Sequence, residues 1–450
     1  MESYYYNGST VLKYLRKVLN EINNEYVDSG LRAAFIMKRF ASKYKLDEEY
    51  ASKLVLLCTL KDIGSFYHDS FIDKNNKALV AASSYAFLKH CSPLGDSAKP
   101  LLFYGARYIE GLDNEDYYAG LLITLIDKIV RYNFLEYTLD EIADMLLQEK
   151  EGVYNPDQIK KVLKLLRSEE DIFVKLNQKN SLFVYEVTSF IQHANYTDEE
   201  LLKYIDMTNF SFEFHNHETL AHTVTVAVIA KELAKLSRLT ENQINCIELA
   251  SLVHDIGKMR IPVSILCKPG KLEPDEYEIM KKHVVYTKEI IEGCFSYKIV
   301  DIASNHHERI DGSGYPKGLR ARDLSIGDKI IAIADVASAL YCKRSYKRSF
   351  PKEKIIEIME SDAKAGKQDA RITAHLIDNF DYIMGLASEK EKEVLDQKAA
   401  MEEEFETLSH SESLIKFFEW LLSHRNMAFF KAISTSSVEQ MRIAFNLKKL

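Results

Sequence analysis

Residues that interrupt helices are scarce in this 450-residue sequence, which contains only 17 glycines and 8 prolines. Glycine and proline most often end helices and strands at turns, so their scarcity favours helices joined by few turns. Apolar residues also recur at helical spacing, as in Val224, Val228 and Ile229, which share one face of a helix. The sequence therefore predicts an all-α fold.

The sequence also lacks a CxxC pair, an excess of basic residues and a long hydrophobic run. Its six cysteines are scattered, which favours reduced thiols in a cytoplasmic protein. The formal net charge is -8, so general binding to duplex nucleic acid is not expected. No apolar run approaches the roughly 18 residues of a membrane span, and the first residues lack the basic and apolar regions of a secretory signal. We expect a cytoplasmic protein with no membrane span.

An internal repeat relates the two halves of the chain. The segment LVLLCTLKDIGSF at 54–66 aligns with IELASLVHDIGKM at 247–259, with Asp-Ile-Gly in register. Three acidic or histidine positions align in the same order: Asp62 with Asp255, His90 with His283, and Asp127 with Asp335. The common order predicts two copies of one helical module.

The two copies differ at the positions that could bind metal. Ser29 stands where the second copy has His222, and Lys61 stands where it has His254. A lysine at that position would put a cation where a metal should be. The first copy is therefore predicted to bind no catalytic metal and to serve packing or regulation.

Histidines and carboxylates are concentrated in the second copy, and seven of the thirteen histidines lie between His215 and His307. A lone histidine on a helix is usually a polar core residue, so the whole set has to be considered. Glu218 and His222 share a helix face, and Asp335 lies in an apolar stripe where an unpaired carboxylate is costly. The candidate ligands are Glu218, His222, His254, Asp255, His283, His306, His307 and Asp335.

This set mixes nitrogen and oxygen ligands. Such a set suits Fe, Mn, Zn, Ni or Co better than Ca, and the absence of thiolates argues against a structural zinc site. Eight ligands are too many for one ion, so two or three ions are expected. Lys258 and Arg309 lie nearby in the sequence, and both are suited to holding phosphate oxygens. The Gly-rich loop at 311–316 follows Arg309 and reads as the rim of a site.

These motifs together resemble the HD-GYP family of cyclic-dinucleotide phosphodiesterases, over roughly residues 215–380. The matching runs are HNHETLAH at 215–222, LVHDIGK at 252–258, MKKH at 280–283, NHHERIDGSGYPKGL at 305–319, IAIADV at 331–336 and KRSYK at 343–347. The resemblance implies an all-α fold and a centre of two or three metals, often iron, held by the eight ligands named above. It implies catalytic roles for Asp255, Lys258 and Arg309, and substrate contacts by Lys258, Arg309, Asp311, Gly312, Gly314, Tyr315, Pro316 and Arg344.

The reaction implied is hydrolysis of cyclic di-GMP or 3',3'-cyclic GMP-AMP to the linear dinucleotide, with a further step to mononucleotide left open. Three runs depart from the family's common pattern without removing a ligand: 284–287, 337–340 and 344–346. They leave the choice between the two dinucleotides open. Two other functions also stay open, namely a catalytically weak cyclic-dinucleotide receptor and an HD phosphohydrolase that acts on another nucleotide.

The predicted domain limits follow from the repeat and the resemblance. They are a degenerate HD-type domain at 1–167, a connector at 168–210, the HD-GYP domain at 211–385 and a C-terminal helical extension at 386–450. Within the connector, the run at 181–190 is compatible with either a strand or a helix. A homodimer through helical surfaces is left open.

Overall fold

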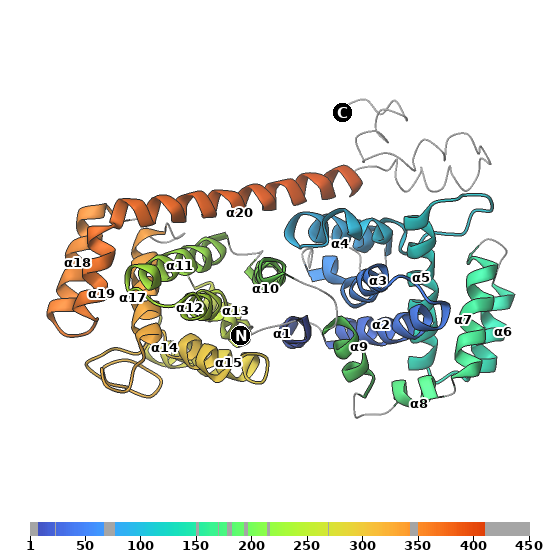
Figure 1. The fold of residues 1–450 in the computed structure, drawn as a ribbon, viewed down its shortest axis with the longest axis horizontal. Helices are drawn as coiled ribbons and strands as arrows, with labels where there is room; N and C mark the ends of the chain where they lie inside the picture. Colours follow the sequence, from blue (N-terminus) through green and yellow to red (C-terminus); the bar gives the residue numbers. More distant parts are fainter. Residues whose placement is uncertain are drawn as a thin grey trace. The chain divides into compact units, whose positions relative to one another are not determined.

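The computed structural model describes residues 8–22, 24–66, 77–149, 153–169, 171–177, 182–192, 197–213, 217–268, 270–342 and 350–409. These residues form helices and no strand, which confirms the predicted all-α class (Figure 1). None of the described helices combines the length and the apolar character needed to cross a membrane. The chain divides into two compact units, Met1–Asn24 with Asn195–Ala399 and Glu25–Ala194 with Ala400–Leu450. We call them the histidine unit and the lysine unit.

The histidine unit has a core in which α11 packs against α12 and α17, while α15 packs against α16 and a short 3₁₀ helix at Ile256–Arg260. Its helices are α1 (Gly8–Ile22), α10 (Asp198–Glu213), α11 (His217–Leu236), α12 (Glu241–Val253), α13 (Val263–Leu266), α14 (Pro274–Lys281), α15 (His283–Ile291), α16 (Tyr297–Ser304), α17 (Ile326–Tyr341), α18 (Lys352–Lys364) and α19 (Ala370–Asp378). Capping boxes fix where several of them begin. At α17, for example, Asp328 NH donates to Ser325 Oγ while the Asp328 carboxylate accepts from Ser325 NH.

Helix α1 belongs to the histidine unit although the 170 residues from Glu25 to Ala194 separate it from the rest of that unit. It packs against α10 and α15. The Tyr14 hydroxyl donates to Asn209 Oδ1 at 3.1 Å, and the Tyr14 ring lies 5.2 Å from that of Phe295. Glu21 pairs with Arg260 at 2.6 Å. The first residues of the chain are thus part of the unit that carries the histidines.

The lysine unit is built from the remaining helices, with two 3₁₀ helices at Ile63–Phe66 and Gly95–Phe103 packed against α4. Its helices are α2 (Asn24–Tyr44), α3 (Glu48–Leu60), α4 (Lys77–Cys91), α5 (Glu115–Phe134), α6 (Leu139–Gln148), α7 (Pro156–Ser168), α8 (Asp171–Asn177) and α9 (Leu182–Gln192). From residue 182 onward, the ambiguous run in the predicted connector is therefore helical and forms most of α9.

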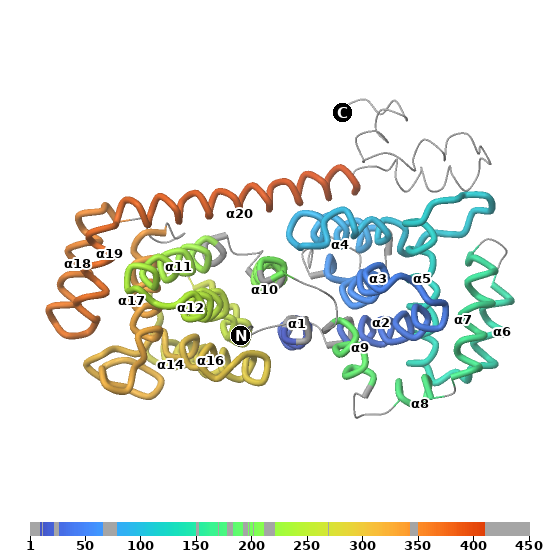
Figure 2. Tube along the Cα trace, in the orientation of Figure 1, coloured from blue at the N-terminus to red at the C-terminus, as the bar shows by residue number. Residues whose placement is uncertain are grey.

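Helix α20 (Phe380–Ser409) is the last described element and follows α19 in the trace (Figure 2). It covers the first part of the predicted C-terminal extension, and residues 410–450 lie outside the described part of the chain. The first twenty residues of α20 group with the histidine unit and its last ten with the lysine unit. The domain limits inferred from the sequence stay predictions.

Candidate metal centre

The centre begins where α12 ends and the chain turns into the 3₁₀ helix, which places His254 and Asp255 side by side. Gly257 allows α15 to approach this turn, since a Cβ there would lie only 2.0 Å from the His283 carbonyl oxygen. Thr287 closes the contact by accepting from Gly257 NH at 3.0 Å and donating to the His254 carbonyl at 2.8 Å. This close packing brings His283, the first residue of α15, to the His254–Asp255 pair.

Seven of the eight predicted ligands come together around Asp255 and Asp335. Asp255 Oδ2 lies 3.2 Å from His254 Nε2, and Asp255 Oδ1 lies 3.4 Å from His283 Nε2. Asp335, on α17, lies 3.1 Å from His222 Nε2. The seven are His222, His254, Asp255, His283, His306, His307 and Asp335. They come from α11, the end of α12, α15, the segment after α16, and α17.

Backbone hydrogen bonds decide which ring nitrogen of three histidines faces the centre. Nδ1 of His254, His283 and His306 each lies 2.7 Å from the carbonyl three residues earlier. A carbonyl only accepts, so each Nδ1 carries the proton and each neutral ring points an unprotonated Nε2 inward. His222 is held similarly, with Nδ1 2.9 Å from Ser338 Oγ.

The inward nitrogens have no donor to satisfy them. His283 Nε2 and His306 Nε2 lie 3.2 Å apart, so two lone pairs face each other unless a cation lies between them. His254 Nε2 and Asp255 Oδ1 are buried and make no hydrogen bond to any described residue, although both lie within ion-pair distance of a neighbour. Buried acceptors without donors are costly. The set therefore fits metal ions, which could be held by His222, His254 and Asp255 and by His283, His306 and His307.

The pKa values of four histidines and of both carboxyl groups agree with this use, and His254 is the exception. Burial lowers the pKa of His222, His306 and His307, and that of His283 falls to about 3. Burial also disfavours the charge of His254, but the Asp255 carboxylate beside it raises its pKa above the ordinary value. Burial alone would raise the pKa of both carboxyl groups, yet the neighbouring histidines hold those of Asp255 and Asp335 below their usual range, and Lys258 adds to this effect at Asp255. Ionised carboxylates and neutral imidazoles are the forms that bind metal.

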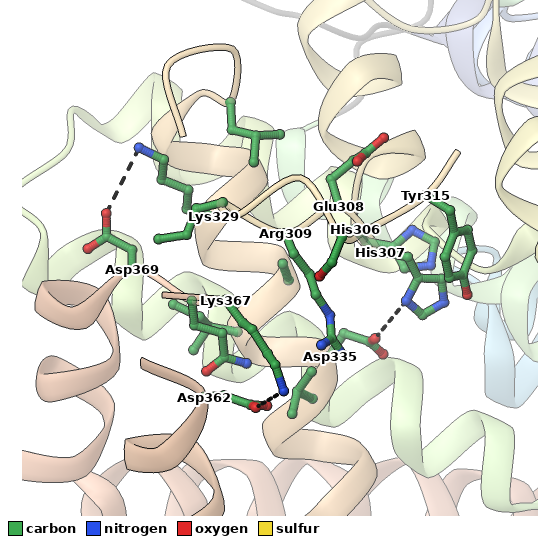
Figure 3. A pocket seen from close by; sticks show the side chains of 18 of the residues that line it. His306, His307, Glu308, Arg309, Tyr315, Lys329, Asp335, Asp362, Lys367 and Asp369 are labelled. Carbon is green, nitrogen blue, oxygen red and sulfur yellow. Dashed lines mark hydrogen bonds and ion pairs between the residues drawn. The ribbon is translucent and has the colours of Figure 1, made fainter. Parts of the chain in front are cut away.

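The two predicted phosphate-binding cations differ in their surroundings. Lys258 Nζ forms an ion pair with Asp255 Oδ2 at 2.5 Å, so it reaches the centre directly. Arg309 lines a pocket beside the centre and forms no ion pair with any described residue. In Figure 3 it extends between the His307–Asp335 pair and the Lys367–Asp362 pair.

The loop after Arg309 folds back on the histidine pair. Tyr315 NH donates to the His307 carbonyl at 3.2 Å, and their rings lie 4.7 Å apart. A Cβ on Gly314 would lie 2.4 Å from Arg309 N, so only glycine fits there. The buried Glu308 carboxylate accepts from two backbone NH groups of the loop, at 2.7 and 2.9 Å. The loop is thus tied tightly to the segment that carries His306 and His307.

The pocket beside the centre has a volume of about 490 Å³, within the range of small-molecule sites. Arg309, Gly314 and Tyr315 line it, as do His306, His307 and Asp335. Four predicted contacts are not among its lining residues: Lys258, Asp311, Gly312 and Pro316. Asp311 instead accepts from Ser313 NH and Oγ at 2.9 and 2.7 Å, which stabilises the turn.

Two predicted site residues lie outside what the structure describes. Glu218 is in α11 but its side chain is not described, and Arg344 falls in the gap at 343–349. Sequence reasoning missed other residues that build the site, namely Ser338, Thr287, Glu308, Lys329, Asp362 and Lys367. Ser338 and Thr287 had a signal, because each falls in one of the runs that depart from the family pattern. The others contact the site through folding alone.

The lysine unit has a buried cluster at the positions that aligned with the centre. Lys61 Nζ pairs with Asp127 Oδ1 at 2.8 Å and also contacts Asp62, and Ser29 Oγ lies 3.4 Å away. Burial alone would lower the pKa of Lys61, but these two carboxylates raise it above its usual value. Lys61 is 1% exposed and is therefore a charged lysine in the interior.

In both units a side-chain hydroxyl links a glycine NH to a backbone carbonyl, and we call this link the hydroxyl bridge. Ser84 Oγ accepts from Gly64 NH at 2.9 Å and donates to the Lys61 carbonyl at 2.8 Å, as Thr287 does with Gly257 and His254. By these hydrogen bonds, Ser84 takes the place in the lysine unit that Thr287 takes in the histidine unit, and Val80, four residues earlier, takes that of His283. The ungapped alignment of His90 with His283 was wrong. His90 lies near Glu404 instead, at 3.4 Å.

Comparison with known proteins identifies the fold. Residues 164–372 match the HD domain family. This chain contains an HD domain. The match includes all seven gathered ligands and extends toward the N-terminus beyond the region of sequence resemblance.

Relatives of this HD domain occur among bacterial phosphodiesterases. The chain is 25% identical over 81% of its length to the 3'3'-cGAMP-specific phosphodiesterase 1 of Vibrio cholerae, covering 90% of that protein. It is 41% identical over 39% of its length to the 3'3'-cGAMP-specific phosphodiesterase 2 of the same organism, and 37% identical over 41% to a cyclic di-GMP phosphodiesterase of Thermotoga maritima. The chain spans only 34% and 50% of the lengths of these last two relatives.

A solved structure shares the fold over most of the chain. The crystal structure of a cyclic GMP-AMP specific phosphodiesterase of V. cholerae is 18% identical, with a TM-score of 0.51, and the match covers 84% of this chain and 98% of that one. At this identity the likeness concerns the fold. This structural match covers much more of the chain than residues 164–372, which match the HD domain family.

Proposed function

We propose that this chain is a metal-dependent phosphodiesterase that hydrolyses a cyclic dinucleotide, cyclic di-GMP or 3',3'-cyclic GMP-AMP, to the linear dinucleotide. The observation that carries the proposal is the pair of inward nitrogens of His283 and His306, 3.2 Å apart with no donor between them, beside a pocket lined by Arg309. The relatives named above, which act on these two dinucleotides by name, support the substrate class.

The metals would be held by the seven gathered ligands together with Glu218 of α11. When bound, they supply Lewis acidity toward the phosphate and a water activated near neutral pH. Fe or Mn suits the mixed imidazole and carboxylate set, and Zn, Ni or Co is compatible with it. The role of the protein is to orient the imidazoles and to keep the inward nitrogens unprotonated. The hydrogen bonds of the Nδ1 atoms serve this role.

Two cations would act on the phosphate itself. Lys258 reaches the centre from the 3₁₀ helix, where its ammonium group would exchange the Asp255 contact for a phosphoryl oxygen. Arg309 would hold phosphate oxygens from the pocket side with two parallel hydrogen bonds. Both would stabilise the charge that develops in the transition state. Tyr315 and the loop tied by Glu308 would limit the access of water to this side of the centre.

The test is incubation of the purified, metal-loaded protein with cyclic di-GMP and with 3',3'-cyclic GMP-AMP, followed by chromatography of the products. Asp255→Ala and Asp335→Ala should abolish hydrolysis and lower bound metal in elemental analysis. Asp301→Asn, on the exposed side of α16, is the matched control and should change neither. Full activity in either alanine variant would rule out the assigned centre.

We further propose that the lysine unit is a degenerate copy of the HD domain, which would bind no catalytic metal. The shared hydroxyl bridges of Thr287 and Ser84 support a common ancestry, and the ammonium group of Lys61 between Asp62 and Asp127 supports the absence of metal. Bound metal per chain in the Asp62→Asn variant tests this, because it should equal that of the wild type. The loss of one ion per chain in that variant would contradict it.

A further inference from the structure

The pocket beside the metal centre extends past Arg309 to a second polar end, formed by the end of α18 and the turn before α19. Three side chains meet there: Asp362, Lys367 and Gln368. Lys367 Nζ pairs with Asp362 Oδ1 at 3.0 Å. The turn is fixed to the segment after Arg309, because Ile310 NH donates to the Lys367 carbonyl at 3.2 Å. Figure 3 shows this end separated from His307 and Asp335 by Arg309.

Two side-chain oxygens at this end of the pocket accept no hydrogen bond from the described residues. The other oxygen of Asp362, Oδ2, accepts no hydrogen bond from a described residue, although the side chain is only 20% exposed. Gln368 is 7% exposed, and its Oε1 is buried without a hydrogen-bond partner in the described structure. Buried polar groups normally have partners, so the unpaired Gln368 oxygen points to a ligand that brings a donor, and Asp362 Oδ2 can accept a second one.

The pocket also has an apolar wall of small side chains. Ala332, Val336 and Ala339 of α17 line it. A flat aromatic ring can lie against such a wall, whereas a sugar or phosphate would lose its hydration there. The ligand therefore needs a flat face and an edge that carries donors for Asp362 and Gln368 and an acceptor for Lys367.

We propose that Asp362, Lys367 and Gln368 form a subsite for a guanine base of the substrate. Guanine presents two adjacent donors, N1–H and the N2 amino group, which a carboxylate accepts together, and its O6 accepts from an ammonium group. Adenine has an acceptor at N1 and no amino group at C2, so it could offer Asp362 only the single donor group at N6. This assignment rests on the proposed function and makes Asp362 the specificity residue of the site.

The experiment compares kcat/KM for cyclic di-GMP, 3',3'-cyclic GMP-AMP and cyclic di-AMP. The wild type should prefer the two guanine-containing dinucleotides over cyclic di-AMP. Asp362→Ala should lower kcat/KM for cyclic di-GMP by about 10- to 100-fold, the loss expected for a hydrogen bond to a charged group, and should reduce the preference over cyclic di-AMP with metal content unchanged. Glu360→Gln is the matched control, because Glu360 lies on the same helix and pairs with Lys364 in solvent. It should behave as the wild type.

A Lys367→Ala variant separates base recognition from phosphate binding. If Lys367→Ala and Asp362→Ala lower the turnover of all three dinucleotides equally, this end of the pocket binds the sugar-phosphate ring and the guanine subsite is wrong. The guanine subsite is also wrong if Asp362→Ala leaves the ratio of kcat/KM for cyclic di-GMP to kcat/KM for cyclic di-AMP unchanged.

Binding measurements keep the subsite testable if the proposed reaction fails. If the wild type hydrolyses none of the three, the same dinucleotides are titrated by calorimetry into Asp255→Ala and into Asp255→Ala/Asp362→Ala. The subsite then requires tighter binding of cyclic di-GMP than of cyclic di-AMP that is lost in the double variant. Equal binding in both variants, or none in either, rejects it.

Discussion

Single residues determine the difference between the two units. A buried imidazole at position 254 leaves a lone pair that needs a cation, whereas the lysine at position 61 supplies the cation itself. Lys61 forms ion pairs with both Asp62 and Asp127, so the protein itself supplies the cation that these carboxylates need. The stability of the lysine unit should therefore depend on Lys61 as that of the histidine unit depends on metal.

Replacing Lys61 by methionine tests this dependence. Lys61→Met would leave Asp127, which is 2% exposed, without its counter-charge, and the loss of one partner of a buried pair costs about 3–5 kcal/mol. The double variant Lys61→Met/Asp127→Asn should recover much of that loss, because no buried charge is left unpaired there. Urea unfolding followed by circular dichroism measures both. Equal stability of the single variant and the wild type would show that Lys61 is dispensable.

Asp206, on α10, gives the histidine unit a pH-dependent stability. Burial raises its pKa to about 7, Lys390 opposes this, and Glu248 and Glu393 add to it. Since the folded state holds a proton that the unfolded state releases near pH 4, the free energy of unfolding should fall as pH rises from about 4 to about 7, by up to about 1.4 kcal/mol per pH unit. Asp206→Asn should flatten this part of the melting-temperature profile. An identical slope in the variant would rule out Asp206 as its source.

Among the elements, α1 is the one whose place is least expected. The Tyr14 hydroxyl, the Asn209 amide and the Leu252 carbonyl form a chain of hydrogen bonds from α1 through α10 to the end of α12. Leu252 lies two residues before His254, so α1 supports the turn that carries the centre. A truncated chain that begins near Asp198 would lack this support.

Substitution of Asn209 measures the support. Asn209→Ala would leave the Leu252 carbonyl buried without this donor, at a cost of about 1–3 kcal/mol, and should lower the melting temperature of the histidine unit and weaken metal retention during dialysis. Tyr14→Phe removes one of the two hydrogen bonds and should have a smaller effect. If the two variants are equally stable, the hydrogen bond to Leu252 contributes nothing.

On the scale of the whole molecule, metal should stabilise one unit and leave the other unchanged. A ligand that binds only the folded state stabilises it by RT ln(1 + [L]/Kd). Removal of metal with EDTA should therefore increase hydrogen exchange in peptides around His254 and His306, while peptides around Lys61 stay protected. Mass spectrometry of the full chain resolves the two sets. Equal deprotection of both sets would contradict the division of roles.

The sequence by itself determined the helical class and seven of the residues that meet at the centre. Sparse glycine and proline with a helical apolar period act locally, and adjacent ligands such as His254–Asp255 and His306–His307 keep their spacing in any fold. Tertiary structure alone decided the rest. The partners of α1 are remote in the sequence, and an apolar helix face does not specify which surface it will cover. The hydroxyl bridge of Ser84 aligns Val80, and not His90, with His283. This bridge forms only when α4 packs against Gly64, so the sequence alone did not reveal the correspondence.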